Sequence, residues 1–180
     1  MIVYLVVAVV VLFVVVNFLL ALSSKFSPIP YFPTQSTDMG LILKALGLKK
    51  ADTLYDLGAG DGKIILAAVQ DSPCTVKGVE IHPLLIAIMH IRRLLSPQRE
   101  QIHIIWRSLF RLNISDATVI YLYVGPFFMK QIMDKIRKDR PPHLRRIVSY
   151  WYDFQLEKPF EWLPKRRKIQ GKNAIHILEK

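Results

Sequence analysis

Residues 55–63 read YDLGAGDGK, and this glycine-rich segment carries the strongest fold signal in the 180-residue chain. It follows the apolar run Thr53–Leu57, which predicts a strand, and it opens into Lys63–Gln70, whose apolar spacing predicts a helix. Three glycines between positions 58 and 62 let the backbone turn and approach a bound molecule closely, because they carry no Cβ. The segment therefore predicts a strand, a ligand-binding loop and a helix in succession.

The charge of this loop distinguishes between classes of ligand. Loops that hold a pyrophosphate have the spacing G-x-G-x-x-G, whereas this loop has G-x-G-x-G and carboxylates at Asp56 and Asp61. Two carboxylates repel a pyrophosphate, but they suit the ammonium and sulfonium groups of S-adenosylmethionine. We therefore predict S-adenosylmethionine as the cofactor, in preference to a nicotinamide or flavin dinucleotide. A glycine turn without a ligand would leave the two acids unexplained.

A third carboxylate, Glu80, lies near the end of the next predicted strand, Thr75–Ile81. It follows Asp56 by 24 positions, a spacing that fits one β-α-β unit. A carboxylate at this place accepts two hydrogen bonds from a ribose diol. The order of strand, glycine loop, helix, strand and terminal acid indicates nucleoside binding. It does so more strongly than the glycine loop alone or Glu80 alone.

The rest of the chain continues the alternation of strands and helices. Further strands are predicted at 101–106, 117–124 and 145–151, and helices at 83–95 and 127–138. Residues 168–170 and 174–178 flank a Gly-Lys-Asn turn and predict a terminal antiparallel hairpin. The predicted fold class is α/β, with a mostly parallel, Rossmann-like sheet covered by helices on both faces.

An apolar segment precedes this domain. Residues 2–22 contain no charged side chain and would span roughly 30 Å as a helix, which matches the hydrocarbon core of a bilayer. We predict a transmembrane anchor at 1–24, a linker rich in proline and aromatic residues at 25–36, and the cofactor-binding domain at 37–180. Since the positive charge follows the anchor, we predict a single-pass membrane protein with its catalytic domain on the cytoplasmic side. A cleaved signal peptide is the alternative, although no Lys or Arg precedes the run.

The overall composition narrows the choice of partners. The formal net charge is +11, which favours solubility or attraction to anionic lipid, and nucleic acid is not predicted as a partner. The single cysteine, Cys74, excludes an internal disulfide, and the five histidines have no metal-ligand spacing, so no metal site is predicted. Nothing in the sequence indicates the oligomeric state.

Four segments resemble known enzymes: Pro30–Thr34, Tyr55–Lys63, Gly78–Pro83 and Thr118–Pro126. Tyr55–Lys63 and Gly78–Pro83 resemble class I S-adenosylmethionine-dependent methyltransferases. Pro30–Thr34 resembles, more narrowly, the membrane-anchored lysine methyltransferases of the ATP synthase c-subunit and the adenine nucleotide translocase. The resemblance implies a class I methyltransferase fold, and it implies that Tyr31, Thr34 and Tyr123 line the acceptor site. The cofactor-binding residues that it implies are Asp56, Gly58, Ala59, Gly60, Asp61, Gly62, Glu80, Ile81, Ser108 and Leu109.

Two positions depart from the pattern of that family. Ser108 stands where relatives often carry an acid that contacts the adenine amine, so its hydroxyl or nearby backbone groups would have to contact the adenine. Residues 124–127, VGPF, lack the polar first residue of the Asp/Asn-Pro-Pro-Tyr/Phe motif that many amine methyltransferases carry. This difference argues against a nucleobase amine as the methyl acceptor.

The function predicted from these features is protein-lysine N-methylation of a membrane-associated protein. A lysine acceptor must first lose its proton, because its free pKa is about 10.4, and burial in an apolar channel lowers that pKa. No dedicated base is required, and no catalytic residue is predicted. The alternatives are a lipid or small-amine methyltransferase, an RNA methyltransferase, and a non-catalytic membrane-anchored module that binds the cofactor or acts as a scaffold.

Overall fold

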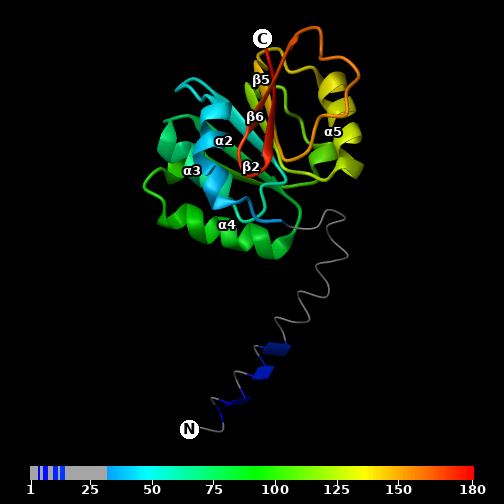
Figure 1. Cartoon of the computed structure of the whole chain (residues 1–180). Helices are drawn as coiled ribbons and strands as arrows, with labels where there is room; N and C mark the ends of the chain where they lie inside the picture. The colour runs from blue at the N-terminus through cyan, green and yellow to red at the C-terminus, as the bar shows by residue number, and fades with distance from the viewer. Residues whose placement is uncertain (1–3, 5, 8–9, 12, 15–31) are drawn as a thin grey trace.

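The computed structural model describes residues 4, 6–7, 10–11, 13–14 and 32–180. Within the described residues, seven strands form one sheet in the order β3-β2-β1-β4-β5-β7-β6 (Figure 1). Strand β7 runs antiparallel to both of its neighbours, and the other neighbouring strands are parallel. The sheet is therefore mixed, with the antiparallel hairpin at one edge, as the sequence predicts.

The elements have the following bounds. The strands are β1 (Thr53–Leu57), β2 (Thr75–Glu80), β3 (Ile102–Trp106), β4 (Val119–Leu122), β5 (Arg146–Tyr150), β6 (Lys165–Gln170) and β7 (Ala174–Glu179). The α-helices are α2 (Met39–Leu46), α3 (Lys63–Asp71), α4 (Pro83–Leu95) and α5 (Pro126–Asp139). Short 3-10 helices are η1 (Ser36–Asp38), η2 (Arg99–Gln101) and η3 (Leu109–Arg111).

Two strands, β4 and β6, differ in length from the prediction by three residues or more. Strand β4 has four residues instead of eight, because the ladder to β1 extends only from Val119 to Leu122. Strand β6 begins three residues earlier than predicted, and its additional residues are the cations at 165–167. They pair with β7 while their side chains face solvent at the edge of the sheet, so they give no apolar signal in the sequence.

Helices cover both faces of the sheet. Helices α2, α3 and α4 pack on one face, and α5 packs on the other together with the segment 152–163 (Figure 1). Each face has its own apolar cluster, with fully buried side chains such as Leu54 on the first face and Leu57 on the second. Burial of each such side chain contributes about 1.5–3 kcal/mol to the stability of the fold. Because successive side chains of β1 face opposite sides of the sheet, this strand stabilises both helical layers.

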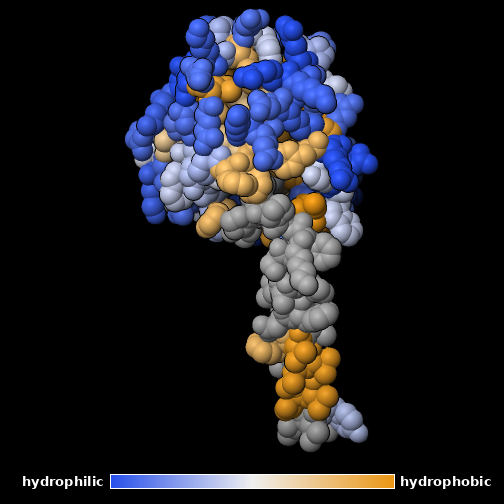
Figure 2. Space-filling model, turned by 90° about the vertical axis from the view of Figure 1, so that its right-hand side faces the viewer, coloured by the Kyte–Doolittle hydropathy of each residue, from blue (hydrophilic) through white to orange (hydrophobic). Residues whose placement is uncertain are grey.

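The carboxyl ends of the parallel strands lie toward the lower edge of the domain. Because β7 is antiparallel to β5, its final residues at the top of Figure 1 mark the opposite, amino edge of the sheet. The face that carries α5 is largely hydrophilic, and its main hydrophobic area lies in the lower part of the domain (Figure 2). Apolar surface is thus found near the edge at which open α/β sheets bind their ligands.

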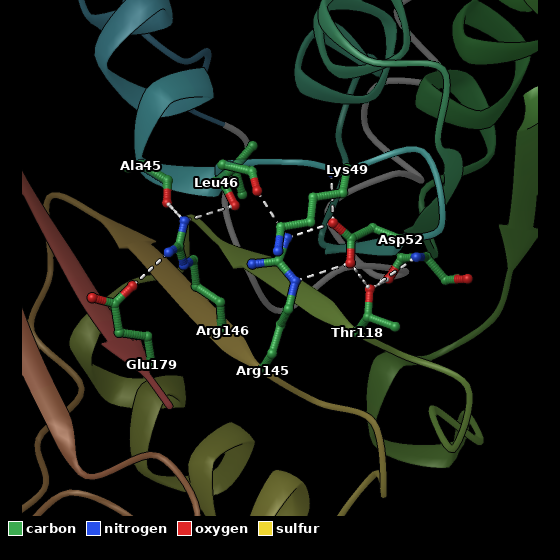
Figure 3. A network of polar contacts seen from close by, with 10 residues as sticks. Ala45, Leu46, Lys49, Asp52, Thr118, Arg145, Arg146 and Glu179 are labelled. Atoms are coloured by element: carbon green, nitrogen blue, oxygen red, sulfur yellow. Dashed lines mark hydrogen bonds and ion pairs between the residues drawn. The ribbon is translucent and has the colours of Figure 1, made fainter.

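A polar network closes the amino edge (Figure 3). The Asp52 carboxylate accepts hydrogen bonds from the Lys49 N–H at 2.7 Å and from the Thr118 hydroxyl at 2.8 Å, and it is ion-paired with Arg145. Nearby, Arg146 is paired with Glu179 at 2.5 Å. Burial alone would raise the pKa of Asp52, but the hydrogen bonds from Arg145, Thr118 and Lys49 hold it below its ordinary value. This network joins the beginnings of β1, β4 and β5.

We expect Asp52→Asn to lower the free energy of unfolding by about 3 kcal/mol, because it leaves the half-buried Arg145 without its counter-charge. The wild-type contribution is present above the ordinary pKa of 3.8 and is lost as the pH falls through the lower folded-state pKa. Urea unfolding at pH 7 and at acidic pH measures both effects. Asp134→Asn is the matched control, since its ion pair with Arg137 is exposed and should change stability by less than about 0.5 kcal/mol. Equal stability of the two variants would contradict the assigned role of Asp52.

The predicted membrane anchor requires a correction. No helix in the part of the chain that the structure describes has the length and apolar character needed to cross a membrane. This finding overturns the transmembrane helix predicted in front of the α/β domain and the single-pass membrane localisation that depended on it. The prediction rested on the length and the uncharged, apolar character of residues 2–22. Most of the range 1–24, and residues 25–31 of the predicted linker, lie outside the described residues.

Candidate active site

The glycine loop lies across the end of β2. The N–H groups of Gly58 and Ala59 both donate to the Val79 carbonyl at 2.9 Å. Gly58 and Gly62 have φ values of +96° and +81°, in the left-handed region that residues with a Cβ rarely adopt. The predicted turn is therefore present, and glycine is required there by the backbone conformation.

Glu80 is directed into this loop from the end of β2. Its side chain is buried, and its Oε2 atom accepts a hydrogen bond from the Gly60 N–H at 2.9 Å. Its Oε1 atom accepts from the N–H groups of Ile81 at 2.7 Å and His82 at 2.9 Å. Next to it, the Nδ1 atom of His82 caps α4 by accepting from the Leu85 N–H at 3.4 Å. Three backbone donors thus fix the Glu80 carboxylate beside the glycine loop.

Asp56 lies on the same face of the sheet as Glu80. It is buried at the end of β1, and no described residue donates a hydrogen bond to its carboxylate. Burial, and then the negative charges of Glu80 and Asp61, raise the pKa of Asp56 well above its ordinary value. A cationic ligand would favour the ionised form of this carboxylate, so the site suits the ammonium group of an amino acid moiety.

Asp61 has a different environment from Asp56. Its carboxylate accepts from Arg92 Nη1 at 2.7 Å and from the Lys63 N–H at 3.2 Å, where it helps to begin α3. Arg92 comes from α4, 31 positions away, and no feature of the sequence indicates this pair. Asp61 is therefore ion-paired, whereas Asp56 and Glu80 have no cationic partner among the described residues, and the use of Asp61 in cofactor binding stays a prediction.

The segment that precedes α2 lies beside the loop. Lys63 Nζ donates to the Thr34 carbonyl and to the Ser36 hydroxyl, both at 2.8 Å. Thr34 is buried close to the hydroxyl of Tyr121, which pairs in register with Asp56. Burial first, and then the charge of Asp56, raise the pKa of Tyr121 well above its ordinary value, although Thr34 opposes this effect. Thr34 is thus close to Tyr121 beside Asp56, while Tyr31 lies outside the described residues.

Tyr123 belongs to an aromatic group on this same face. Its ring meets that of Tyr150 edge to face, with centroids 5.0 Å apart. The Tyr150 hydroxyl donates to Asp38 Oδ2 at 2.9 Å and accepts from Asn173 Nδ2 at 2.8 Å. Asp38 also accepts from the N–H groups of Lys172 and Asn173 at 2.8 and 2.9 Å. This buried network, absent from the predictions, joins η1 to the β6–β7 turn and supports the ring beside Tyr123.

Ser108 and Leu109 follow β3 at the same edge of the sheet, where Leu109 is buried and begins η3. The last residue of β3, Trp106, pairs in register with Glu80, and its indole N–H donates to the Ile81 carbonyl at 3.0 Å. Trp106 is largely exposed and was not among the predicted site residues. Its position beside Glu80 makes it an additional candidate for contact with a nucleoside.

The arrangement fits the predicted cofactor. Asp56 is a buried carboxylate without a hydrogen-bond donor among the described residues, and Glu80 lies fixed beside the glycine loop on the same face. Within the described ranges, no cluster of three or more His, Cys, Asp or Glu side chains could hold a metal ion. The fold and this group of residues define a class I S-adenosylmethionine-dependent methyltransferase.

The family follows from a sequence comparison. The model of the family described as the ANTKMT methyltransferase domain matches residues 56–161, and the chain belongs to this family. The match begins at Asp56 and includes the glycine loop, Glu80 and Tyr123.

Individual proteins of known name are similar to this chain. A "Protein-lysine N-methyltransferase" of Saccharolobus islandicus is 28% identical over 83% of this chain and 91% of its own length. An "Adenine nucleotide translocase lysine N-methyltransferase" of Mus musculus is 23% identical, over 67% of this chain and 52% of its own length. A solved RNA methyltransferase of Salinibacter ruber, in complex with S-adenosyl-L-homocysteine, has a TM-score of 0.72 and 23% identity, over 82% of this chain and 93% of that one. The structural similarity shows the shared fold.

Proposed function

We propose that this methyltransferase transfers a methyl group to the side-chain amine of a lysine in a protein. The carrying observation is that Thr34, Tyr121 and Tyr123 lie on the face of the sheet that also presents Asp56 and Glu80. The names of the Saccharolobus islandicus and Mus musculus relatives support lysine as the acceptor. Because this chain spans only 52% of the Mus musculus protein, the substrate of that relative is not transferred to it.

The residues that would hold the cofactor are those around the glycine loop. We propose that Asp56 binds the ammonium group, that Glu80 accepts hydrogen bonds from the ribose diol, and that Ile81, Ser108 and Leu109 lie against the adenine. The backbone of residues 58–62 would approach the ligand closely. When bound, S-adenosylmethionine supplies a methyl carbon whose bond to the sulfonium sulfur breaks as its bond to the amine nitrogen forms, which leaves a neutral thioether.

The remaining residues would position the amine and exclude water. The amine must be neutral to attack, and the apolar surroundings of Tyr121 and Tyr123 would lower the pKa of a lysine placed there. Burial raises the pKa of both tyrosines, so their hydroxyls stay protonated at neutral pH and do not act as bases. Their oxygen atoms, with that of Thr34, would accept hydrogen bonds from the amine and orient its lone pair. Transfer leaves an alkylated ammonium, which must lose a proton before it can accept a further methyl group.

The finer proposal is that the acceptor protein is associated with a membrane. It is supported by the hydrophobic area in the lower part of the domain and by two largely exposed aromatic residues, Phe32 and Phe127. An acceptor with apolar surface around its lysine would cover these side chains. The proposal of a membrane-associated acceptor depends on the proposal of lysine methylation, since it concerns only which proteins present the lysine.

The test is methyl transfer from labelled S-adenosylmethionine to a whole-cell extract, followed by separation of protein, lipid and RNA. We expect label in protein, mass increases of 14, 28 or 42 on lysine (multiples of one CH₂), and enrichment in the membrane fraction. Label confined to lipid or to RNA would overturn the proposal. Labelled lysine confined to soluble proteins would overturn only the finer statement. A Glu80→Ala variant serves as the control for contaminating methyltransferases.

A further inference from the structure

Trp151 has an unusual backbone conformation at the edge of the candidate site. Its φ value is +73°, in the left-handed region, where a bulky side chain is strained at a cost of about 1–3 kcal/mol. Its N–H donates to the Ala174 carbonyl at 2.7 Å, which holds this conformation at the end of β5. The residue is 45% exposed, so burial of the indole does not explain why the strain is maintained. Such strain is often found where a side chain has a function.

The strained conformation places the indole ring beside Tyr123. In a regular strand, Trp151 would point to the face opposite Tyr150. Both rings instead contact Tyr123, Tyr150 edge to face and Trp151 stacked, with centroids 6.4 Å apart and an interplanar angle of 21°. Tyr152 stacks on Trp151 with centroids 5.7 Å apart. The result is a partly exposed aromatic wall, formed by Tyr123, Trp151 and Tyr152.

Two carboxylates close to the wall already have partners: Asp153, which follows Tyr152 in the chain, and Asp38, which is bound to Tyr150 beside Tyr123. Asp153 is ion-paired with Arg166 and accepts from the Phe154 N–H, and Asp38 is held by Tyr150 and the β6–β7 turn. A free carboxylate would keep a nearby lysine protonated, because it raises the pKa of the amine. Aromatic faces attract a cation more weakly than a carboxylate does, and they also pack against the methylene groups of the lysine side chain. A wall of this kind therefore suits an amine that must be neutral before transfer and is cationic after it.

We propose that the acceptor lysine side chain lies against this aromatic wall and that Trp151 is a specificity-determining residue for the acceptor. The inference rests on the proposed function and adds the residue that selects the substrate. The methylene groups lie along the indole face, and the amine reaches past Tyr123 toward the proposed cofactor site at Asp56 and Glu80. Trp151 contributes to acceptor binding and takes no part in cofactor binding.

The test is Trp151→Gly in the full chain, because glycine removes the indole and accepts a positive φ without strain. We expect thermal stability equal to or above that of the wild type, and cofactor affinity by calorimetry within about twofold. The KM for a synthetic peptide spanning the lysine labelled in the extract should rise about tenfold, with a smaller change in kcat. Trp151→Phe should restore part of the KM effect.

Gln155→Gly is the matched control, since Gln155 also has a positive φ, of +53°, but is outside the aromatic wall. It should leave the KM unchanged. An unchanged KM in Trp151→Gly, while the wild type methylates the peptide, would overturn the inference and leave the proposed function intact. Loss of cofactor affinity, or failure of Trp151→Gly to fold, would also overturn it, because both contradict the assigned role. If the wild type labels no protein lysine, the proposed function itself fails.

Discussion

Glu80→Ala should lower the affinity for S-adenosylmethionine by about a hundredfold or more. We expect the carboxylate to accept two hydrogen bonds from the ribose diol, and hydrogen bonds to a charged group contribute about 1.5–3 kcal/mol each. A loss of about 2.7 kcal/mol corresponds to a hundredfold change. The substitution also removes the acceptor of the Gly60 N–H at 2.9 Å, so the glycine loop loses its support at the same time.

Calorimetric titration of the purified chain with S-adenosylmethionine measures this effect. Glu100→Ala is the matched control, since its side chain is 83% exposed and its ion pair with Arg99 is also on the surface. Glu80→Gln should fall between the wild type and Glu80→Ala, because the amide keeps one acceptor atom. Wild-type affinity in Glu80→Ala would show that this carboxylate does not face the cofactor, and the proposed cofactor site would then be wrong.

Asp56→Asn should have opposite effects on stability and on cofactor binding. Burial and the nearby acids raise the pKa of Asp56 above its ordinary value of 3.8. Between these two values the unfolded chain has lost the proton while the folded chain keeps it, so stability falls as the pH rises. Asparagine cannot ionise, so the variant does not lose stability in this way as the pH rises. The Tm of the variant at pH 7 should exceed that of the wild type by roughly 3 °C, the shift that about 1 kcal/mol produces in a chain of this size.

The same substitution should weaken cofactor binding by about tenfold or more, because an amide does not attract the ammonium group as a carboxylate does. Binding of the wild type should become tighter as the pH rises through the folded-state pKa of Asp56, since the ligand favours the ionised form and a proton is released. Asp56→Asn should lose this pH dependence. Thermal unfolding at pH 4 and pH 7, with calorimetry in buffers of different ionisation enthalpy, measures all three effects. Identical Tm values at pH 7 would contradict an unfavourable burial of the Asp56 charge.

Short stretches of sequence were sufficient to predict the central features of the fold. The strand Thr53–Leu57 was predicted with its observed bounds, and the terminal hairpin and the position of Glu80 at the end of β2 were also foreseen. Each depends on residues within a few positions of one another: alternation of apolar residues, glycines that permit a turn, or an acid at the end of a strand. The predicted membrane anchor was wrong, because no helix in the described part of the chain is long and apolar enough to cross a membrane.

The contacts around the candidate site could not be predicted from neighbouring residues in the sequence. Arg92 reaches Asp61 across 31 positions, and Asp38 meets Tyr150 across 112. The left-handed conformation of Trp151 also depends on a distant residue, Ala174.

Neighbouring residues thus establish the class of fold, the glycine loop and the acid that follows it, because steric limits and alternation act over a few residues. The buried carboxyl group of Asp56, which has no hydrogen-bond donor among the described residues, and the aromatic wall at Trp151 arise only when the sheet is assembled. Pairing of charges and stacking of rings depend on which distant segments packing brings into contact.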